Sequence, residues 1–497
     1  MTDRTLTEPA TGSVAVPPGT DAPDHSARNR LVISILLVSA FVVILNETIM
    51  GVALPELMVD LQITPSVGQW LTTAFMLTMA VVIPITGFLL QRFDTRPIFF
   101  AAMGLFSLGT LLSAVAPGFG VLVIGRIVQA SGTAIMMPLL MTTVMTLVPP
   151  AARGKTMGNI SIVMSVAPAI GPTISGVILS FLDWRWMFII VLPIAIAALL
   201  LGAARIQNVT EPKKVPIDVT SVVLSAFAFS GLIYGLSSIA EASQGHEIVP
   251  VWVPLVFGAL ALAGFIWRQF VLQRGDRALL DLRVFGTGNF TVTILMMAVA
   301  MAAMFGTLIV LPIYLQTVLG LEPLATGLLL LPGSLLMGLM GPIVGRIYDK
   351  RGPAVLLVPG TAIVSAVLWV MTLLGSATPV PVVLLVHIGL SFGLALMFTP
   401  LFTAGLGSLQ PRFYSHGSAV IGTAQQLAGA AGTALFITVL STVTAGTIAS
   451  GGTDAQAVEA GVRAAFLSGA VVSLLAIVAA FFVRRPADSP AGAPAAH

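Results

Sequence analysis

Hydrophobic runs long enough to cross a lipid bilayer as α-helices recur along almost the whole chain. Such a crossing takes about 20 mostly apolar residues, and polar segments separate the runs here. We place spans at residues 31–54, 68–90, 97–116, 121–147, 156–180, 185–204, 218–239, 250–270, 290–315, 324–348, 353–374, 380–406, 417–446 and 463–483. The pattern therefore predicts an all-α polytopic membrane protein with 14 spans, and the run at 417–446 is long enough to bend.

The composition agrees with a surface that mostly faces lipid. Of 497 residues, 57% are hydrophobic and 9% are charged, and the mean hydropathy is +1.02, whereas a soluble protein carries about a quarter charged residues. The chain has no cysteine, which excludes disulfides and thiolate metal sites. It has no G-x-x-x-x-G-K-[ST] phosphate loop and no metal-ligand spacing, so we expect no cofactor, no metal and no direct use of ATP. We also expect no nucleic-acid partner.

The basic residues indicate how the chain is oriented. An even number of spans puts both termini on one side of the membrane. With the N-terminus in the cytoplasm, 20 of the 23 Lys and Arg fall in cytoplasmic segments, as the positive-inside rule requires. The exceptions are Arg126, inside a span, and Arg185 and Arg463, at outer ends. We expect a multi-pass protein of the cell (inner) membrane with cytoplasmic tails at 1–30 and 484–497, the first of them disordered.

Two charged turns at the cytoplasmic ends of spans resemble each other. Residues 87–96 follow the span at 68–90, and residues 345–352 follow the span at 324–348; in both, a glycine precedes a tight charged turn. Parallel repeats of this kind are a known transporter plan, with the substrate site between the halves near the membrane midplane. The repeat predicts six-helix halves at 31–204 and 290–483, with two extra spans and their linkers at 205–289.

These turns resemble the Gly-x-Leu-x-Asp-Arg-x-Gly-Arg motif of the major facilitator superfamily, and the resemblance extends from residue 31 to residue 483. The second copy keeps Gly345, Asp349 and Gly352, and the first keeps Gly87, Arg92 and Arg96 but has Gln91 in the usual Asp position. Residues 126–132 resemble the family's Arg-x-x-Gln-Gly-x-Gly motif, and residues 183–188 match its W-R-W-x-F patch. Residues 167–176 resemble its antiporter motif, G-x-x-x-G-P-x-x-G-G, with matches at Gly171, Pro172 and Gly176.

The first span resembles one subgroup of this family. Fourteen-span drug:proton antiporters usually have Leu-Asp-x-Thr-Ile-x-x-x-Ala-Leu-Pro there, whereas this chain has Asn46 in the Asp position and a carboxylate at Glu47. This form of the motif resembles that of the lincomycin-efflux-type subgroup. The resemblance implies a major facilitator fold and proton-coupled export of drug-like compounds.

Glu47 and Arg126 are the charged residues that we expect to couple proton movement to transport. An ionised carboxylate inside a membrane is costly, so it usually faces a wet cavity, pairs, or takes up a proton. Both residues lie about seven residues inside the outer ends of their expected spans, so we predict that they are coupled directly or through water and Gln129. The alternatives are a carboxylate in a permanently wet vestibule and an arginine that is a structural hydrogen-bond hub.

The antiporter motif and several other side chains are candidates for further roles. Gly171 and Gly176 leave a smooth helix face, which we expect to pack across the interface between the halves as a hinge or seal; simple helix packing is the alternative. The candidate substrate-binding residues are Asn46, Gln129, Met137, Met141, Tyr314, Gln316, Gln425 and Gln426. The alternatives for them are lipid or core packing and bonding between helices. His387 could be a second protonation site or hydrogen-bonded packing.

The sequence thus predicts a secondary transporter, not an enzyme, driven by the proton gradient. It would exchange external protons for an amphipathic or cationic drug-like compound by rocking two halves, and we expect it to be a monomer. An exporter of a dedicated metabolite, peptide, amino acid or lipid is the first alternative. A non-transporting membrane sensor or scaffold is the second, and it predicts no substrate-dependent proton flux.

Overall fold

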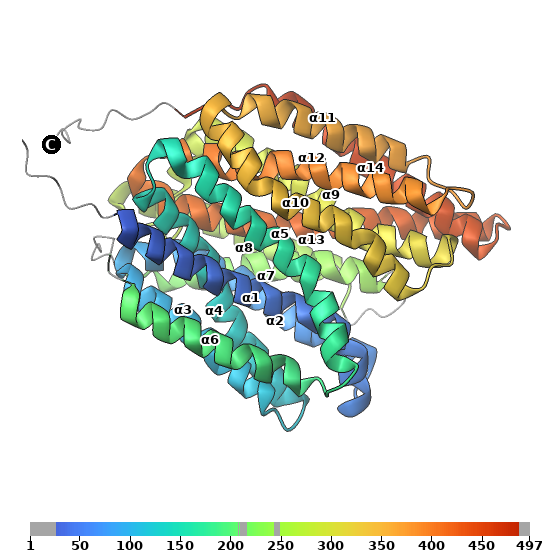
Figure 1. Ribbon diagram of the computed structural model, residues 1–497, viewed down its shortest axis with the longest axis horizontal. Coiled ribbons are helices and arrows are strands. Elements are labelled where there is room, and N and C mark those ends of the chain that lie inside the picture. Colours follow the sequence, from blue (N-terminus) through green and yellow to red (C-terminus); the bar gives the residue numbers. More distant parts are fainter. Residues whose placement is uncertain (1–25, 207, 209–215, 243–248, 487–497) are drawn as a thin grey trace, which may run out of the picture.

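The computed structural model describes residues 26–206, 208, 216–242 and 249–486 of the protein, and these residues form helices joined by short turns (Figure 1). The long helices are α1 (Ser26–Asp60), α2 (Pro65–Arg92), α3 (Thr95–Ala114), α4 (Phe119–Leu147), α5 (Arg153–Leu179), α6 (Arg185–Arg205), α7 (Val219–Ala242), α8 (Trp252–Leu272), α9 (Gly288–Ile313), α10 (Pro323–Arg351), α11 (Ala354–Met371), α12 (Val380–Gly407), α13 (Tyr414–Ala449) and α14 (Asp454–Ala480). The short elements are the 3-10 turns η1 (Pro150–Ala152), η2 (Gln273–Gly275), η3 (Leu282–Gly286) and η5 (Pro411–Phe413), and the π-helical turn η4 (Tyr314–Val318) that extends α9.

The prediction of 14 spans is confirmed, because 14 helices in the described part of the chain are long and apolar enough to cross a membrane. Two boundaries differ from the expected ones. Helix α1 continues to Asp60 instead of ending near residue 54. Helix α14 begins at Asp454 because Thr453 forms a capping box with Gln456. The run at 417–446 lies within one helix, α13.

Helices α1–α6 and α9–α14 form two bundles, which we call the N-terminal and C-terminal halves. The described chain begins and ends at the same end of the molecule, at the left of Figure 1. We call this the terminal end and the opposite one the distal end. Helix α7 contacts α2 of one half and α13 of the other, and Trp70 of α2 stacks on Tyr234 of α7 with ring centroids 6.1 Å apart. Helix α7 therefore lies against both halves, and α8 packs on α7.

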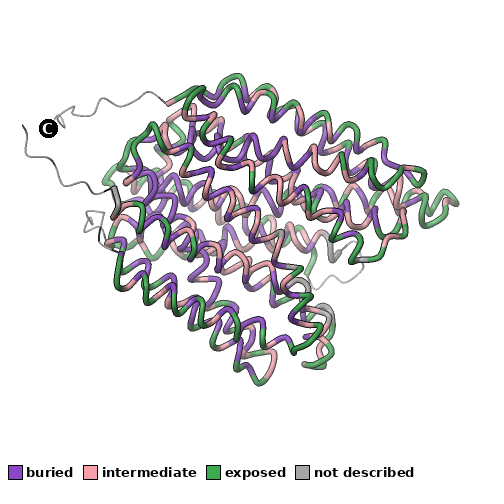
Figure 2. Tube along the Cα trace, in the orientation of Figure 1, coloured by how far each residue is buried: buried purple, intermediate pink, exposed green. Residues whose placement is uncertain are grey.

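The burial pattern matches a bundle with a lipid-facing exterior. Buried residues concentrate where helices meet, and exposed ones follow the outer sides of the peripheral helices (Figure 2). Large apolar side chains are exposed on those sides, including Leu200 of α6, Trp267 of α8 and Leu475 of α14. An aqueous solvent would disfavour such a surface, whereas hydrocarbon accepts it.

Small residues bring the two halves into close contact at the terminal end. Gly154 and Gly158 of α5 face Gly341 and Gly345 of α10, and a Cβ on Gly345 would lie 2.1 Å from the Gly154 carbonyl oxygen. The four-residue glycine spacing on both helices allows their backbones to touch, which is how membrane helices associate closely. Further along α10, a Cβ on Gly338 would meet Val166 of α5 at 2.5 Å.

Candidate functional site

Glu47 of α1 and Arg126 of α4 lie near enough inside the N-terminal half for their charges to attract, although they form no ion pair. Arg126 is 1% exposed and Glu47 is half-buried. No hydrogen bond or ion pair joins the Glu47 carboxylate to another residue in the described ranges. Because α1 runs on to Asp60, Glu47 lies deeper below the distal end of its helix than the predicted boundary at residue 54 implied.

The Arg126 guanidinium is held by its own helix and by two neighbouring helices. Its Nη1 donates to the Gln129 Oε1 at 2.6 Å, and the Gln129 Nε2 donates to the Thr110 Oγ1 of α3 at 2.8 Å. The guanidinium carbon lies 4.0 Å from the centroid of the Phe75 ring of α2, a cation–π contact. This network fixes the guanidinium while leaving its Nε without a hydrogen-bond partner among the described residues.

The antiporter motif packs against α1 directly beside Glu47. A Cβ on Gly171 of α5 would lie 2.2 Å from the Thr48 Oγ1, and the Thr48 hydroxyl donates to the Leu45 carbonyl at 2.9 Å. The Ser175 hydroxyl meets the Met187 sulfur of α6 at 3.2 Å. The expectation that this face packs across the interface between the halves is therefore wrong for the conformation seen here. The reason is geometric, since the contacts of α5 with α10 lie nearer its terminal end.

Gly176 and Pro172 complete that motif. Gly176 is exposed, and a Cβ there would meet nothing within 4 Å. Helix α5 continues through Pro172, and the side chain of that residue lies outside the described ones.

The charged last turn of α10 joins the two halves at the terminal end. The two carboxylate oxygens of Asp349 accept the backbone N–H groups of Gly154 and Lys155, each at 2.8 Å. These groups lie in the first turn of α5, where backbone N–H groups have no partner within the helix and favour an anion. Gly352 ends the turn with φ of +79°, a conformation that suits glycine.

The corresponding last turn of α2 makes a weaker contact across the halves. The Gln91 Nε2 donates to the Arg412 carbonyl at 3.2 Å. Gly87 lets α2 approach α13, since a Cβ there would lie 3.0 Å from the Ala419 Cβ. Arg96 binds within its own half, donating to the Ala203 carbonyl at 2.8 Å. Arg92 lies over the Phe93 ring.

Two pairs of hydroxyl groups and one amide form the remaining hydrogen bonds that we find between the halves. Ser161 bonds Thr399 at 2.8 Å, and Thr142 bonds Ser418 at 3.2 Å, both nearer the terminal end than the distal end. Gln426 of α13 reaches the Met79 sulfur of α2 at 3.6 Å, deeper in the membrane. At the distal end, by contrast, the ion pairs of the described chain stay within one half.

In each half, an arginine at the distal end bonds residues of neighbouring segments of the same half. We call these two groups of residues the distal rims. In the N-terminal half, the Arg185 Nη1 donates to Asp60 at 3.2 Å, and Arg185 also reaches the Ala116 carbonyl. In the C-terminal half, Arg463 pairs with Glu459 at 2.7 Å, and its Nε donates to the Leu374 carbonyl at 2.7 Å. These two arginines were exceptions to the positive-inside pattern, and the carbonyls of adjacent turns explain their positions.

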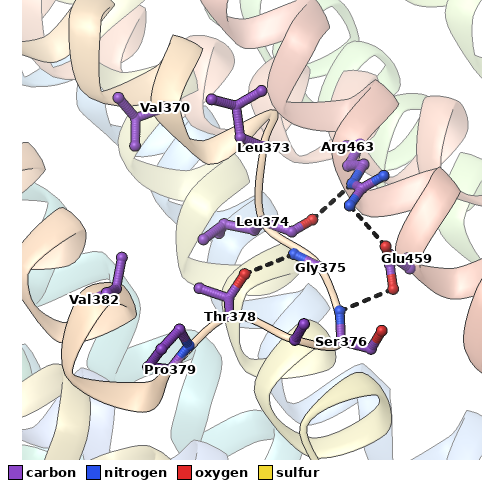
Figure 3. A pocket seen from close by; sticks show the side chains of 11 residues that line it. Val370, Leu373, Leu374, Gly375, Ser376, Thr378, Pro379, Val382, Glu459 and Arg463 are labelled. Carbon is purple, nitrogen blue, oxygen red and sulfur yellow. Dashed lines mark hydrogen bonds and ion pairs between the residues drawn. The ribbon is translucent and has the colours of Figure 1, made fainter.

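A cavity of about 440 Å³ lies beside the second rim, between the turn that joins α11 to α12 and the start of α14 (Figure 3). Its polar groups bond one another: the Gly375 N–H donates to Thr378, and the Ser376 N–H donates to Glu459. Tyr314 is fully buried and its hydroxyl donates to the Gly375 carbonyl at 2.9 Å. Tyr314, a candidate substrate-binding residue, thus connects η4, at the end of α9, to this turn by a hydrogen bond.

The other candidate substrate-binding residues occupy different environments. Asn46 is 2% exposed and its Oδ1 has no partner among the described residues. Met141 is buried, Met137 and Gln425 are half-buried, and Gln316 is exposed in the π-helical turn. The side chain of Gln129 forms hydrogen bonds with Arg126 and Thr110. Sequence reasoning missed Phe75 and the glycines at 154, 158 and 341; the four-residue glycine spacing was the signal available for α5 and α10.

Two six-helix halves with charged side chains between their helices define an α-helical membrane transporter. The Major Facilitator Superfamily matches residues 36–433. The chain is 38% identical over 456 residues to the lincomycin resistance protein LmrB of Bacillus subtilis, covering 90% of this chain and 95% of that one. It is 39% identical over 457 residues to the uncharacterized MFS-type transporter YcnB of the same organism, covering 92% and 95%.

The chain therefore belongs to the major facilitator superfamily and is similar to its lincomycin-efflux subgroup. Its fold also matches the human organic anion transporter MFSD10, with a TM-score of 0.63, 15% identity, and coverage of 91% of this chain and 99% of that one. These matches make the protein a multi-pass membrane transporter, not an enzyme, and its ligand a small molecule.

Proposed function

We propose that the protein is a proton-coupled antiporter that exports amphipathic or cationic drug-like compounds from the cytoplasm by alternating access. It would act as a monomer in the cell membrane, with both termini cytoplasmic. The names of its relatives support efflux of antibiotics, and the distribution of Lys and Arg supports the orientation.

The proposal depends on one observation, the Glu47 carboxylate beside the Arg126 guanidinium without a hydrogen bond or ion pair to a described residue. Ionised, Glu47 attracts the fixed guanidinium; protonated, it loses that attraction. Arg126 stays charged in either case. Proton uptake and release at Glu47 would therefore change how α1 sits against α4, and a cationic substrate would compete for the same carboxylate.

The contacts between the halves support a conformation open at the distal end. The glycine contacts of α5 with α10 and the Asp349 bonds hold the terminal end together. At the distal end, the ion pairs join residues of the same half. With cytoplasmic termini, this is an outward-facing state. Protons from outside would then reach Glu47, and rocking to the inward-facing state would require the Asp349 bonds to break.

Purified protein in proteoliposomes with an imposed pH gradient tests the proposal. We expect lincomycin addition to release protons from wild-type protein and to release none from Glu47→Gln protein. Asp276→Asn is the control, because Asp276 is an exposed acid that pairs with Arg283 outside the long helices. Coupling that survives in Glu47→Gln protein would remove Glu47 from the carrier role. Proton release only with a metabolite, peptide, amino acid or lipid would favour a dedicated exporter, and no flux with any compound would favour a sensor or scaffold.

A further inference from the structure

His387 occupies in the C-terminal half the place that Arg126 occupies in the N-terminal half. Arg126 is the eighth residue of α4, which begins at Phe119, and His387 is the eighth residue of α12, which begins at Val380. Each helix is the fourth of its half, so the two side chains enter from the distal end at equal depth.

The neighbours of the two residues correspond as well. The Arg126 guanidinium lies over Phe75 of α2, while His387 lies against Gly333 of α10, where a Cβ would come 2.7 Å from the His387 Nε2. Phe75 precedes the repeat glycine Gly87 by 12 residues (87 − 75), and Gly333 precedes Gly345 by 12 (345 − 333). The repeat therefore relates the two sites residue by residue.

The hydrogen bonding of His387 leaves one ring nitrogen unused. Its Nε2 lies 3.1 Å from the Leu330 carbonyl oxygen, which can only accept a hydrogen, so Nε2 carries the proton. Its Nδ1 is then a bare acceptor, and it is buried without a partner among the described residues. An unsatisfied buried acceptor is unfavourable, so a donor that reaches it is stabilised. The other histidine in the described chain, His416, differs, because its Nδ1 accepts the Asp281 N–H at 3.4 Å.

We propose that His387 is a substrate-binding residue of the C-terminal half, whose Nδ1 accepts a hydrogen bond from a hydroxyl or ammonium group of the exported compound. The ring as a whole is half-buried and its Nδ1 is covered in this conformation, so a donor would reach that nitrogen when the surrounding helices move during transport. The Glu47 carboxylate in one half and this neutral acceptor in the other would then bind two donor groups of the same substrate. This inference rests on the proposed export function and adds the donor group that the substrate must carry.

Two isosteric variants separate substrate binding from packing. Asn places its polar atom near the Nδ1 position and loses the contact of Nε2 with Leu330, whereas Gln reaches the Nε2 position and loses Nδ1. Lincomycin, which carries hydroxyl groups and a basic amine, is the probe, and its binding to purified protein is measured by calorimetry. We expect His387→Asn to retain affinity within about threefold and His387→Gln to lose at least tenfold, because sites built to bond a polar group discriminate strongly when the bond is lost.

Equal affinity in both variants, or a loss confined to His387→Asn, would overturn the proposal. A measurement on unmutated protein guards against variants that do not fold. With ¹⁵N-labelled histidine, we expect lincomycin to shift the Nδ1 resonance of His387 and to leave that of His416 in place. Wild-type protein that exports lincomycin without this shift would contradict the role of His387 alone. Wild-type protein that neither binds nor exports lincomycin would contradict the export assignment and this inference together.

Discussion

The carboxylate of Asp349, in the last turn of α10, accepts the backbone N–H of Gly154, in the first turn of α5, at 2.8 Å and so joins the two halves of the transporter. A second bond of equal length reaches Lys155. These bonds connect a side chain of one half to the helix terminus of the other, so they exist only while the terminal end is closed. In the proposed alternating-access cycle, they are among the contacts that a change of access would break.

We therefore expect Asp349→Asn to shift the equilibrium away from the distally open state. Loss of the charge weakens two charge-assisted bonds, and about 1.5 kcal/mol of lost stabilisation corresponds to a roughly tenfold shift. The chain has no cysteine, so spin labels on introduced cysteines report cleanly. Labels at Phe93 and Gln410, which are exposed on opposite halves at the terminal end, should move apart. An unchanged distance distribution would show that the other contacts between the halves hold this end without the Asp349 charge.

The close approach of Gly171 to Thr48 predicts a positional requirement in the antiporter motif. We expect Gly171→Ala to reduce substrate-driven proton exchange at least tenfold, because a methyl group there would meet the Thr48 Oγ1 at 2.2 Å and displace α1 beside Glu47. Gly176→Ala is the matched control, since a Cβ there meets nothing within 4 Å. Equal effects of the two substitutions would mean that the motif acts through helix flexibility instead of packing. Thr48→Ala should restore part of the activity of the Gly171→Ala protein.

The shape of the Arg126 network predicts that charge alone is insufficient at this position. Lys keeps the positive charge but lacks the planar guanidinium that stacks on Phe75 and donates to Gln129. We expect Arg126→Lys protein to fold and to lose at least tenfold of its transport rate in proteoliposomes. Thermal stability measured on the same sample separates this from unfolding. Transport at the wild-type rate would assign Arg126 a purely electrostatic role.

The ion pair between Asp218, immediately before α7, and Arg268 of α8 predicts how stability depends on pH. Arg268 donates to both oxygens of Asp218, at 2.6 and 2.7 Å, and Ser221 donates to the same carboxylate. These bonds, the Arg268 bond first, hold the pKa of Asp218 well below its usual range. A lowered folded-state pKa contributes stability that is complete above the unfolded value, about 4, and is lost as the pH falls through the folded value.

We therefore expect the stability difference between wild-type and Asp218→Asn protein to be constant from pH 8 to pH 5 and to shrink below about pH 4. Both side chains are partly exposed, which limits the difference to about 1 kcal/mol. Thermal unfolding in detergent across this pH range measures it. A difference that grows as the pH falls would contradict the assigned ion pair.

The sequence by itself determined the number of helices and their order. These follow from local composition, because hydrocarbon requires about 20 apolar residues for each crossing and each backbone polar group must be bonded within its helix. It also made Glu47 and Arg126 candidates, since charged residues are conspicuous inside apolar runs. Asp349 and Gly345 became candidates for a different reason, because they lie in a charged turn that occurs twice.

Only the tertiary structure decided which helices touch at these residues. The sequence did not reveal that Gly171 faces Thr48 in its own half. A helix face of small residues can pack against any other helix, so the motif does not indicate which one. Nor could the sequence place Phe75 under Arg126, since an aromatic residue in an apolar run carries no distinguishing local signal. The correspondence of His387 with Arg126 needed helix starts accurate to one residue, and those starts are set by packing and capping that apolar content does not report.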